Sequence, residues 1–335
     1  MCTILALESS CDETSAAVYR DGKIITNIIL SQEIHQKYGG VVPELASRAH
    51  QKNIITIVDE AMKTALVDKN ELNAIAYTKG PGLIGALLVA SSFAKGLSLA
   101  LNIPLIGVDH LHAHILANVI DEPKPSLPFL CLLISGGHTQ ILQVDDLMNY
   151  KIIGQTIDDA AGEAFDKEAK VIGLPYPGGQ AISDLAKNGN IKAFHFPSPK
   201  APGFNFSFSG LKTSFLYLIR DHIQSNPDFI KNNINDLCAS YQHRIVTYLL
   251  QKLEKAAAET GIREICLAGG VAANEYLRES LTKMSIKNNW KIYIPELQYC
   301  TDNAAMIAIT AYYKFKKGDF DELDATNYAS GEISN

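Results

Sequence analysis

The chain opens with Thr3-Ile-Leu-Ala-Leu-Glu-Ser-Ser-Cys-Asp-Glu-Thr-Ser-Ala-Ala-Val-Tyr19, in which two apolar runs flank a polar turn. Short apolar runs bounded by turn residues are typical of buried strands, so we predict strands over residues 3–7 and 16–19. Asp21-Gly22 predicts a hairpin turn into a further strand over residues 23–30. The start of the chain is therefore predicted to form hairpin-connected strands.

The same arrangement returns in the second half of the chain. A buried strand is predicted over residues 128–134, followed by the turn Ser135-Gly-Gly-His-Thr139 and a strand over residues 140–144. A later strand over 264–268 leads through Gly269-Gly270 to a helix that starts near Ala273. The proline-containing link Glu122-Pro-Lys-Pro-Ser126 separates the halves. We therefore expect two related α/β units, each opening with a hairpin whose turn is rich in small polar residues.

Between the two hairpins, the sequence predicts alternating helices and strands. A helix is expected from Pro43 to about Leu66, a strand over 74–77, and a strand over 104–108 that leads into a cluster of histidines. Gly80-Pro-Gly82 breaks the chain before an apolar helix over 83–101. That helix contains serines and a lysine, so we predict a buried helix rather than a membrane span.

The bulk composition limits the class of protein. A chain of 335 residues suits two domains, and 47% hydrophobic with 20% charged residues is ordinary for a globular protein. The net charge of −6 argues against a basic coat for nucleic acid, but not against a local basic patch or a partner. The six cysteines form no C-x-x-C pair, which favours reduced thiols in a cytosol, and no apolar leader opens the chain.

The stretch His110-Leu-His-Ala-His114 gathers three of the nine histidines. Apolar residues follow it, so we predict a helix with Asp109 as its N-cap. Residues four apart share a helix face, and two imidazoles at that spacing can bind one metal ion. The alternative is a pair of solvated or hydrogen-bonded histidines. The zinc-protease pattern H-E-x-x-H is absent, because Leu111 stands where its glutamate would be.

The Gly- and Ser-rich turns are candidate anion sites. Successive backbone N–H groups in such turns can hold a phosphate, and glycine permits its close approach. Two such hairpins and the Gly269-Gly270 turn would suit a nucleotide or an adenylate, although each alone can be merely a tight turn.

Three further polar stretches are candidates for function. Residues 158–167 place several carboxylates at a helix start, where they can also complement the helix dipole. Residues 204–213 alternate aromatic and small polar residues, which fits an edge strand or a contact with RNA bases. Asp302 precedes an apolar helix over 304–313 and can be its N-cap.

Taken together and in this order, these stretches resemble the bacterial TsaD family, which makes threonylcarbamoyladenosine in tRNA and was formerly described as a sialoglycoprotein endopeptidase family. The resemblance covers the chain from end to end. The matching stretches are Leu7-Glu-Ser-Ser-Cys-Asp-Glu-Thr14, Gly39-Gly-Val-Val-Pro-Glu-Leu-Ala-Ser-Arg-Ala-His50, Lys79-Gly-Pro-Gly-Leu83, His110–His114, Ser135-Gly-Gly-His-Thr139, Asp158-Asp-Ala-Ala-Gly-Glu-Ala-Phe-Asp-Lys167, Pro175-Tyr-Pro-Gly-Gly179, Phe206-Ser-Phe-Ser-Gly-Leu-Lys-Thr213, Ala268-Gly-Gly-Val-Ala-Ala-Asn274 and Thr301-Asp-Asn303.

The resemblance implies an actin-like (ASKHA) α/β fold, with two lobes around a nucleotide cleft. The expected lobes are 1–124, joined by the C-terminal helix region 300–335, and 125–299. The implied reaction transfers a threonylcarbamoyl group from threonylcarbamoyl-AMP to N6 of the adenosine 3′ of the anticodon, position 37, in tRNAs that read codons beginning with A. The product is N6-threonylcarbamoyladenosine.

The resemblance also assigns the site residues. The implied metal ligands are His110, His114 and Asp302, with one divalent ion per subunit; Fe²⁺ is favoured, with Zn²⁺ or Mg²⁺ as alternatives. The implied adenylate-binding residues are Leu133, Ile134, Ser135, Gly136, Gly137, Asp166, Gly179 and Asn274. Residues expected near the site are Glu8, Ser9, Asp12, Glu13 and His138. The chain has Ser183 where some family members have a substrate-binding aspartate, so that contact is not carried over.

The implied partners are tRNA, a smaller TsaB-like paralogue in a heterodimer, a small TsaE-like ATPase, and a separate enzyme that supplies the adenylate. The implied location is the cytoplasm, without a membrane. Three other hypotheses are a metalloprotease, an ASKHA-type kinase or ATPase, and a catalytically silent scaffold. The missing H-E-x-x-H glutamate disfavours the protease, and the candidate metal ligands disfavour the other two.

Overall fold

The computed structural model describes residues 2–329, which divide into two compact units. The first unit runs up to Lys124 and includes the stretch from Pro295 onward, and the second spans Pro125–Ile294. Each unit is built on its own five-stranded sheet. The predicted mixed α/β class is confirmed.

The sheet of the first unit has the order β3-β2-β1-β4-β5. β1 pairs antiparallel with β2, and β2 with β3, whereas β4 and β5 run parallel to β1. This pairing confirms the hairpins predicted at the start of the chain. The strands are β1 (Thr3–Glu8), β2 (Glu13–Arg20), β3 (Lys23–Ser31), β4 (Ala74–Gly80) and β5 (Leu105–Asp109).

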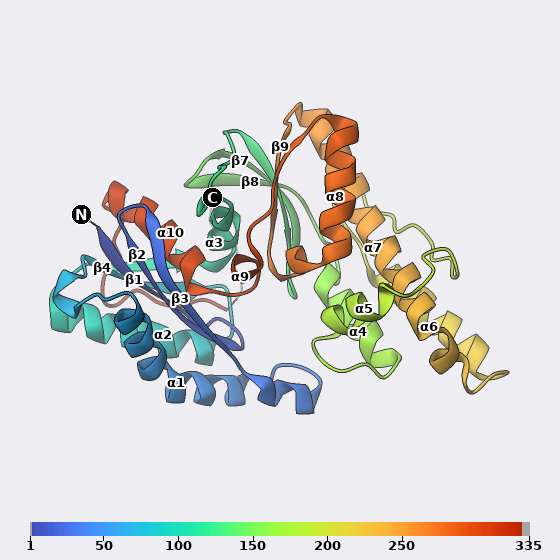
Figure 1. The fold of residues 1–335 in the computed structure, drawn as a ribbon, viewed down its shortest axis with the longest axis horizontal. Helices are drawn as coiled ribbons and strands as arrows, with labels where there is room; N and C mark the ends of the chain where they lie inside the picture. The colour runs from blue at the N-terminus through green and yellow to red at the C-terminus, as the bar shows by residue number, and fades with distance from the viewer. Residues whose placement is uncertain (1, 330–335) are drawn as a thin grey trace. The chain divides into compact units, whose positions relative to one another are not determined.

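Helices cover both faces of this sheet, because side chains along a strand point alternately to either side. Leu5 and Leu7 of β1 pack with α1 (Pro43–Thr64) and α2 (Ile84–Leu101) in one core. The opposite face packs against α10 (Ala304–Lys317) (Figure 1). The C-terminal helix is thereby brought to the strands that begin the chain.

Helix α2 is less buried than its composition predicted. Its small residues, such as Ala86, Ala90 and Ala94, face α1 and β4, but Leu88 is 49% and Leu99 is 67% exposed. The prediction of a buried helix was therefore correct for one face only. Among residues 2–329, α2 is also the one helix whose length and composition would allow it to cross a membrane.

The second unit repeats the topology of the first. Its order β10-β9-β6-β7-β8 again has antiparallel hairpins on one side of the first strand and parallel strands on the other. The predicted relation between the two halves is therefore confirmed. The strands are β6 (Phe129–Ile134), β7 (Thr139–Asp146), β8 (Asn149–Gln155), β9 (Glu264–Ala268) and β10 (Lys291–Tyr293).

The long helix α7 (Phe229–Thr260) organises the helices of the second unit. It packs against α5 (Gly178–Ala186), α6 (Ser209–Ile223) and α8 (Glu275–Asn288), and α5 and α6 contact α4 (Ala161–Val171). One buried side chain on α4 is unusual: Glu168 is fully buried, and among the described residues 2–329 neither of its carboxylate oxygens has a hydrogen-bond partner. Burial raises the pKa of Glu168 to about 7.

Candidate metal centre and substrate site

Strand β5 of the first unit leads directly into the short helix that carries His110 and His114. Asp109 ends the strand, and its Oδ1 accepts a hydrogen bond from His112 N–H at 2.8 Å, which confirms it as the N-cap of α3 (His110–Leu116). His110 and His114 are one helical turn apart, with ring centroids separated by 4.7 Å. Every side chain of α3 is buried, so these imidazoles belong to the interior of the unit rather than to a solvated face.

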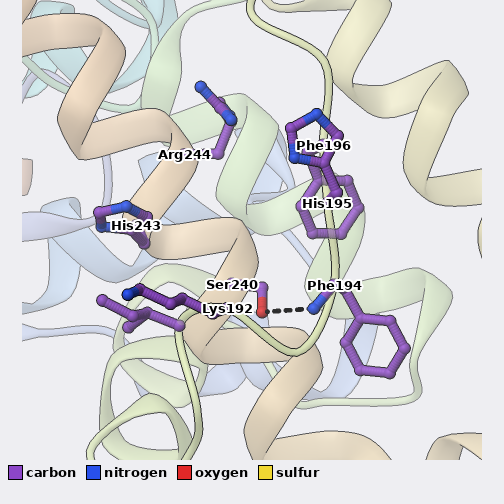
Figure 2. Close-up of a pocket in the computed structure, with 8 residues that line it drawn as sticks. Lys192, Phe194, His195, Phe196, Ser240, His243 and Arg244 are labelled. Atoms are coloured by element: carbon purple, nitrogen blue, oxygen red, sulfur yellow. Dashed lines mark hydrogen bonds between the residues drawn. The ribbon is translucent and has the colours of Figure 1, made fainter.

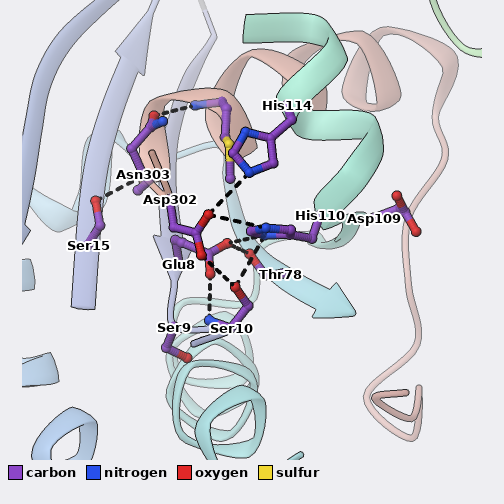
Figure 3. Close-up of polar contacts among 12 residues, drawn as sticks. Glu8, Ser9, Ser10, Ser15, Thr78, Asp109, His110, His114, Asp302 and Asn303 are labelled. Carbon is purple, nitrogen blue, oxygen red and sulfur yellow. Dashed lines mark hydrogen bonds and ion pairs between the residues drawn. The ribbon is translucent and has the colours of Figure 1, made fainter. Parts of the chain in front are cut away.

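Asp302 reaches the same place from the far end of the chain. Its Oδ1 lies 3.1 Å from Nε2 of His114 and 3.3 Å from Nε2 of His110 (Figure 3). The N-cap of α10 is Asn303, whose side chain accepts a hydrogen bond from Met306 N–H at 3.0 Å. The alternative interpretation of Asp302 as a helix cap is therefore wrong, and its carboxylate is left to face the histidines.

The geometry and chemistry of these three side chains fit a divalent metal ion. Their ligand atoms lie within 4.8 Å of one another. Two ligand atoms that each bind one ion at about 2.0–2.2 Å are about 3.0–3.5 Å apart, which matches the distances from Asp302 to both imidazoles. The other nitrogen of His110, Nδ1, lies 3.3 Å from Glu8 Oε2, as expected for a carboxylate that orients a metal-binding histidine.

Electrostatics also favour a cation at this place. Burial, followed by the charges of Asp302 and Asp12, raises the pKa of Glu13 to about 9. Burial lowers the pKa of His110, but the Asp302 and Glu8 carboxylates outweigh it and raise that pKa well above its usual range. Burial would raise the pKa of Asp302, but the two histidines hold it well below its usual range. A divalent ion would offset this excess of buried negative charge.

The turn after β1 supports the centre. Glu8 is fully buried; its Oε1 accepts a hydrogen bond from Ser10 N–H at 2.5 Å and its Oε2 accepts one from the Thr78 hydroxyl. Sequence reasoning missed Thr78, whose signal was a small polar residue at the end of a buried strand. Ser9 has another role, because its hydroxyl donates to Ala86 O of α2.

In the second unit, the turn between β6 and β7 contains the candidate residues Ser135, Gly136 and Gly137. Only two of their three backbone N–H groups are available to a ligand. Ser135 N–H donates to His138 O at 2.8 Å, so this group closes the hairpin. Within residues 2–329, the N–H groups of Gly136 and Gly137 have no such partner, and both glycines are exposed. Leu133 and Ile134 are fully buried in β6, where both pair with β7 and Leu133 also pairs with β9, so they support the turn from within the sheet.

Two other candidate residues, Asp166 and Asn274, hold helix starts in the second unit, and a third, Gly179, lies in one of these starts. Oδ1 of Asp166 accepts hydrogen bonds from Gly178 N–H at 2.8 Å and Gly179 N–H at 3.2 Å, which fixes the N-terminus of α5. Asn274 caps α8, because its Oδ1 accepts from Leu277 N–H at 2.9 Å, and its Nδ2 donates to Gln242. These side chains fix the starts of α5 and α8.

The aromatic stretch 204–213 is not an edge strand, and two of its phenylalanines are too buried to stack on bases. Phe206 makes a single bridge to Thr156, and the helix α6 begins at Ser209. Phe206 and Phe208 are fully buried against Tyr248, so they cannot stack on RNA bases. Asp158 accepts hydrogen bonds from residues 207–209, which ties this stretch to the start of α4.

Replacement of Gly162 by alanine is expected to deform the turn of the second unit. A Cβ on Gly162 would lie 2.5 Å from Ser135 O and 2.8 Å from Gly136 Cα, so the backbone must shift. Overpacking of this kind costs about 1–3 kcal/mol, so we expect a lower melting temperature and about tenfold weaker binding of AMP. The measurements are thermal unfolding and calorimetry with AMP.

Gly210 provides the matched control, because it too is the second residue of a helix and nothing lies within 4 Å of its Cβ position. Gly210→Ala should leave AMP binding unchanged. Equal affinity for AMP in both variants would show that the turn does not contribute to binding.

Two units of the same five-stranded topology define a protein of the actin-like (ASKHA) class, and comparisons with known structures agree. HypF, in a crystal structure of its full-length phosphate- and nucleotide-bound form, matches with a TM-score of 0.64 and 15% identity over 96% of this chain and 47% of that one. Component A of (R)-2-hydroxyglutaryl-CoA dehydratase from Acidaminococcus fermentans matches with a TM-score of 0.55 and 14% identity, over 94% and 99% of the two chains.

Sequence relatives identify the family. The family model described as tRNA N6-adenosine threonylcarbamoyltransferase (TsaD) matches residues 23–309. Proteins of that name from Porphyromonas gingivalis and Christiangramia forsetii are 55% and 53% identical, over 97% and 96% of this chain and of their own lengths. The chain belongs to the tRNA N6-adenosine threonylcarbamoyltransferase family, which confirms the resemblance, and it is a transferase of tRNA modification.

Proposed function

We propose that the chain transfers a threonylcarbamoyl group from threonylcarbamoyl-AMP to N6 of adenosine 37 in tRNAs that read codons beginning with A. Membership of the family supports the reaction. The cluster of His110, His114 and Asp302 is the observation that carries the proposal, because it gives the transferase a place for a Lewis acid.

The side chains His110, His114 and Asp302 would hold the ion, and Fe²⁺ is our first choice because two histidines and one carboxylate suit Fe(II). Zn²⁺ and Mg²⁺ are the alternatives. A bound ion would polarise and orient oxygens of the donor. Glu8 and Ser10 keep the His110 ring in place through its Nδ1, at 3.3 Å and 3.2 Å.

The second unit would contribute residues that bind an adenylate. The N–H groups of Gly136 and Gly137 are suited to anionic oxygens. Asp166 holds Gly178 and Gly179 at the start of α5, and Asn274 caps α8, so these side chains would keep the two helix starts in place for the adenylate. The donor is already activated and the adenine amine is a weak nucleophile. Catalysis therefore rests on positioning, which can supply up to about 7–11 kcal/mol, without a covalent enzyme intermediate.

No observation among residues 2–329 favours a protease or a kinase instead. Glu8 is the carboxylate nearest His110 Nδ1, but it is fully buried and already accepts hydrogen bonds from Ser10 and Thr78. It is thereby suited to orienting His110 rather than to activating water. Likeness to HypF supports the fold alone.

We also propose that the enzyme works in the cytoplasm with a smaller TsaB-like paralogue, a TsaE-like ATPase and a separate adenylate-forming enzyme. The net charge of −6 supports a role for partner proteins in tRNA binding, because an acidic protein and a polyanionic substrate repel each other.

The test is reconstitution of the full chain with these partners and unmodified tRNA, read out by mass spectrometry of nucleosides. We expect N6-threonylcarbamoyladenosine at position 37, and none when threonylcarbamoyl-AMP formation is omitted. The Porphyromonas gingivalis relative, assayed with its own partners, is the positive control. Modification by that enzyme but none by this chain would contradict the proposal.

A further inference from the structure

A small pocket in the second unit is lined by basic side chains. Its volume is about 200 Å³, and the side chains that matter here are Lys192, His195, Ser240, His243 and Arg244, which we call the basic pocket. They come from two segments, residues 191–196 and the middle of α7 (Figure 2). Among residues 2–329, no aspartate or glutamate lines the pocket.

The positive charges of the basic pocket are not neutralised by the protein. Lys187, a few residues earlier, pairs with Asp184 and Glu275. Within residues 2–329, neither Lys192 nor Arg244 forms an ion pair with a carboxylate. Burial lowers the pKa of His243, and the charges of Arg244 and Lys192 lower it further, so the three groups repel one another. An anion in the pocket would relieve this repulsion.

The walls of the basic pocket are held in place before a ligand arrives. Ser240 Oγ accepts a hydrogen bond from Phe194 N–H and donates one to Asn190 O, each at 3.1 Å, which ties the segment to α7. Phe196 is buried and stacks on Phe215, with ring centroids 5.7 Å apart. His195 thus projects from a backbone anchored on both sides.

The imidazole of His243 is also fixed. Its Nδ1 lies 2.7 Å from the Tyr276 hydroxyl, which leaves Nε2 for a ligand. Preorganised donors lose little entropy when an anion binds. The basic pocket is therefore built to bind an anion, in contrast to the solvated lysines elsewhere on the surface.

The size and composition of the basic pocket fit a phosphate group. A volume of about 200 Å³ lies below the roughly 300–1,000 Å³ of sites that enclose whole ligands, so a nucleotide would not be enclosed. Arginine and lysine are the side chains that bind phosphate best. Backbone phosphates of RNA present such a group without the rest of a ligand having to enter.

We propose that the basic pocket binds a backbone phosphate of the tRNA substrate. This inference rests on the proposed function, since that function makes tRNA the substrate. It explains how a chain with a net charge of −6 gains local affinity for a polyanion. The pocket contributes to tRNA binding and not to the chemical step.

The test compares one double variant, which carries both Lys192→Gln and Arg244→Gln, with the wild-type protein in the reconstituted system. We expect the KM for tRNA to rise about tenfold or more, with kcat and AMP affinity unchanged. The slope of log Kd for tRNA against log salt should also fall by about 1, because one phosphate contact is lost. The single variant Lys192→Arg keeps the positive charge and the native Arg244. It should have the wild-type KM for tRNA and the wild-type salt slope.

The charge-matched control is Arg220→Gln with Lys283→Gln, which also removes one arginine and one lysine from the second unit. These side chains are 60% and 77% exposed and lie outside the pocket. The control should change the salt slope and the KM far less than the pocket variant does. Thermal unfolding of each variant checks that the fold is intact.

Each remaining outcome separates the two proposals. If wild type modifies tRNA but the pocket variant keeps the wild-type KM and salt slope, the pocket proposal is wrong and the function stands. If the variant instead loses binding of inorganic phosphate, measured by ³¹P NMR, while tRNA affinity is unchanged, the pocket is a free-phosphate site and the proposal is overturned. If wild type makes no modified nucleoside, the proposed function itself fails.

Discussion

Replacing both His110 and His114 by alanine is expected to abolish metal binding and to lower the rate of tRNA modification about 10³-fold. The imidazoles supply two of the three ligands, and Asp302 alone cannot retain a divalent ion in competition with water. Loss of Lewis-acid stabilisation of several kcal/mol corresponds to a rate change of this size. The measurements are metal content by mass spectrometry and modified nucleoside formed per enzyme.

The fold should survive this double change. His114 is fully buried and its Nδ1 has no hydrogen-bond partner in the part of the chain that the structure describes, so its removal also removes an unsatisfied polar atom. Without the histidines, however, the Asp302 carboxylate loses its two imidazole partners, and some loss of stability follows. Circular dichroism and the melting temperature separate an intact variant from an unfolded one.

His112→Ala is the matched control for the metal centre. His112 belongs to the same helix and is only 9% exposed, yet it stands outside the ligand cluster. The His112→Ala variant should keep full metal content. A double variant of His110 and His114 that still binds one ion and remains active would rule out the proposed centre.

Much of the fold could be predicted from local patterns. Apolar runs, the Asp21-Gly22 turn and the Gly- and Ser-rich turns located the strands, and their repetition predicted two related units. Local patterns predicted burial less well. Helix α2 is apolar nearly all round, but its environment buries only the face rich in alanine.

The partner of the histidines could not be found from spacing. Asp302 lies 188 positions after His114, and it became a candidate ligand only through family resemblance. Asp302 and Asn303 are both good N-cap residues, so the sequence alone cannot say which one caps α10. The packing of α10 against β1 and β2 decides this, because it engages Asn303 in the cap and turns Asp302 toward α3.

The sequence indicates the basic pocket even less clearly than it indicates Asp302 as a metal ligand. Lys192 and His195 form one pair and His243 and Arg244 another, about fifty positions apart, and neither pair belongs to a recognisable motif. Only the docking of residues 191–196 on α7 brings the pairs together. Tertiary structure thus creates a local basic site that the acidic net charge neither excluded nor located.

Glu168→Gln is expected to stabilise the second unit, and the gain should grow with pH. The pKa of Glu168 is raised by burial from 4.5 to about 7. The folded protein therefore holds a proton that the unfolded chain releases. The stability that this proton contributes is fully present below about pH 4.5 and is lost as the pH rises through 7. The loss amounts to about 3 kcal/mol for wild type, whereas the neutral glutamine has no charge to bury.

The chain carries a single tryptophan, Trp290, which lies in the second unit and reports on its unfolding. Urea titrations followed by Trp290 fluorescence at pH 5, 6, 7 and 8 should show the Glu168→Gln advantage increasing to about pH 7 and then levelling off. Glu279→Gln, on a side chain that is 57% exposed, is the control and should give a small difference that does not grow in this way. A Glu168→Gln advantage that stayed constant from pH 5 to pH 8 would mean that Glu168 is already ionised in the folded protein, with its buried charge stabilised by Lys212 and Tyr241.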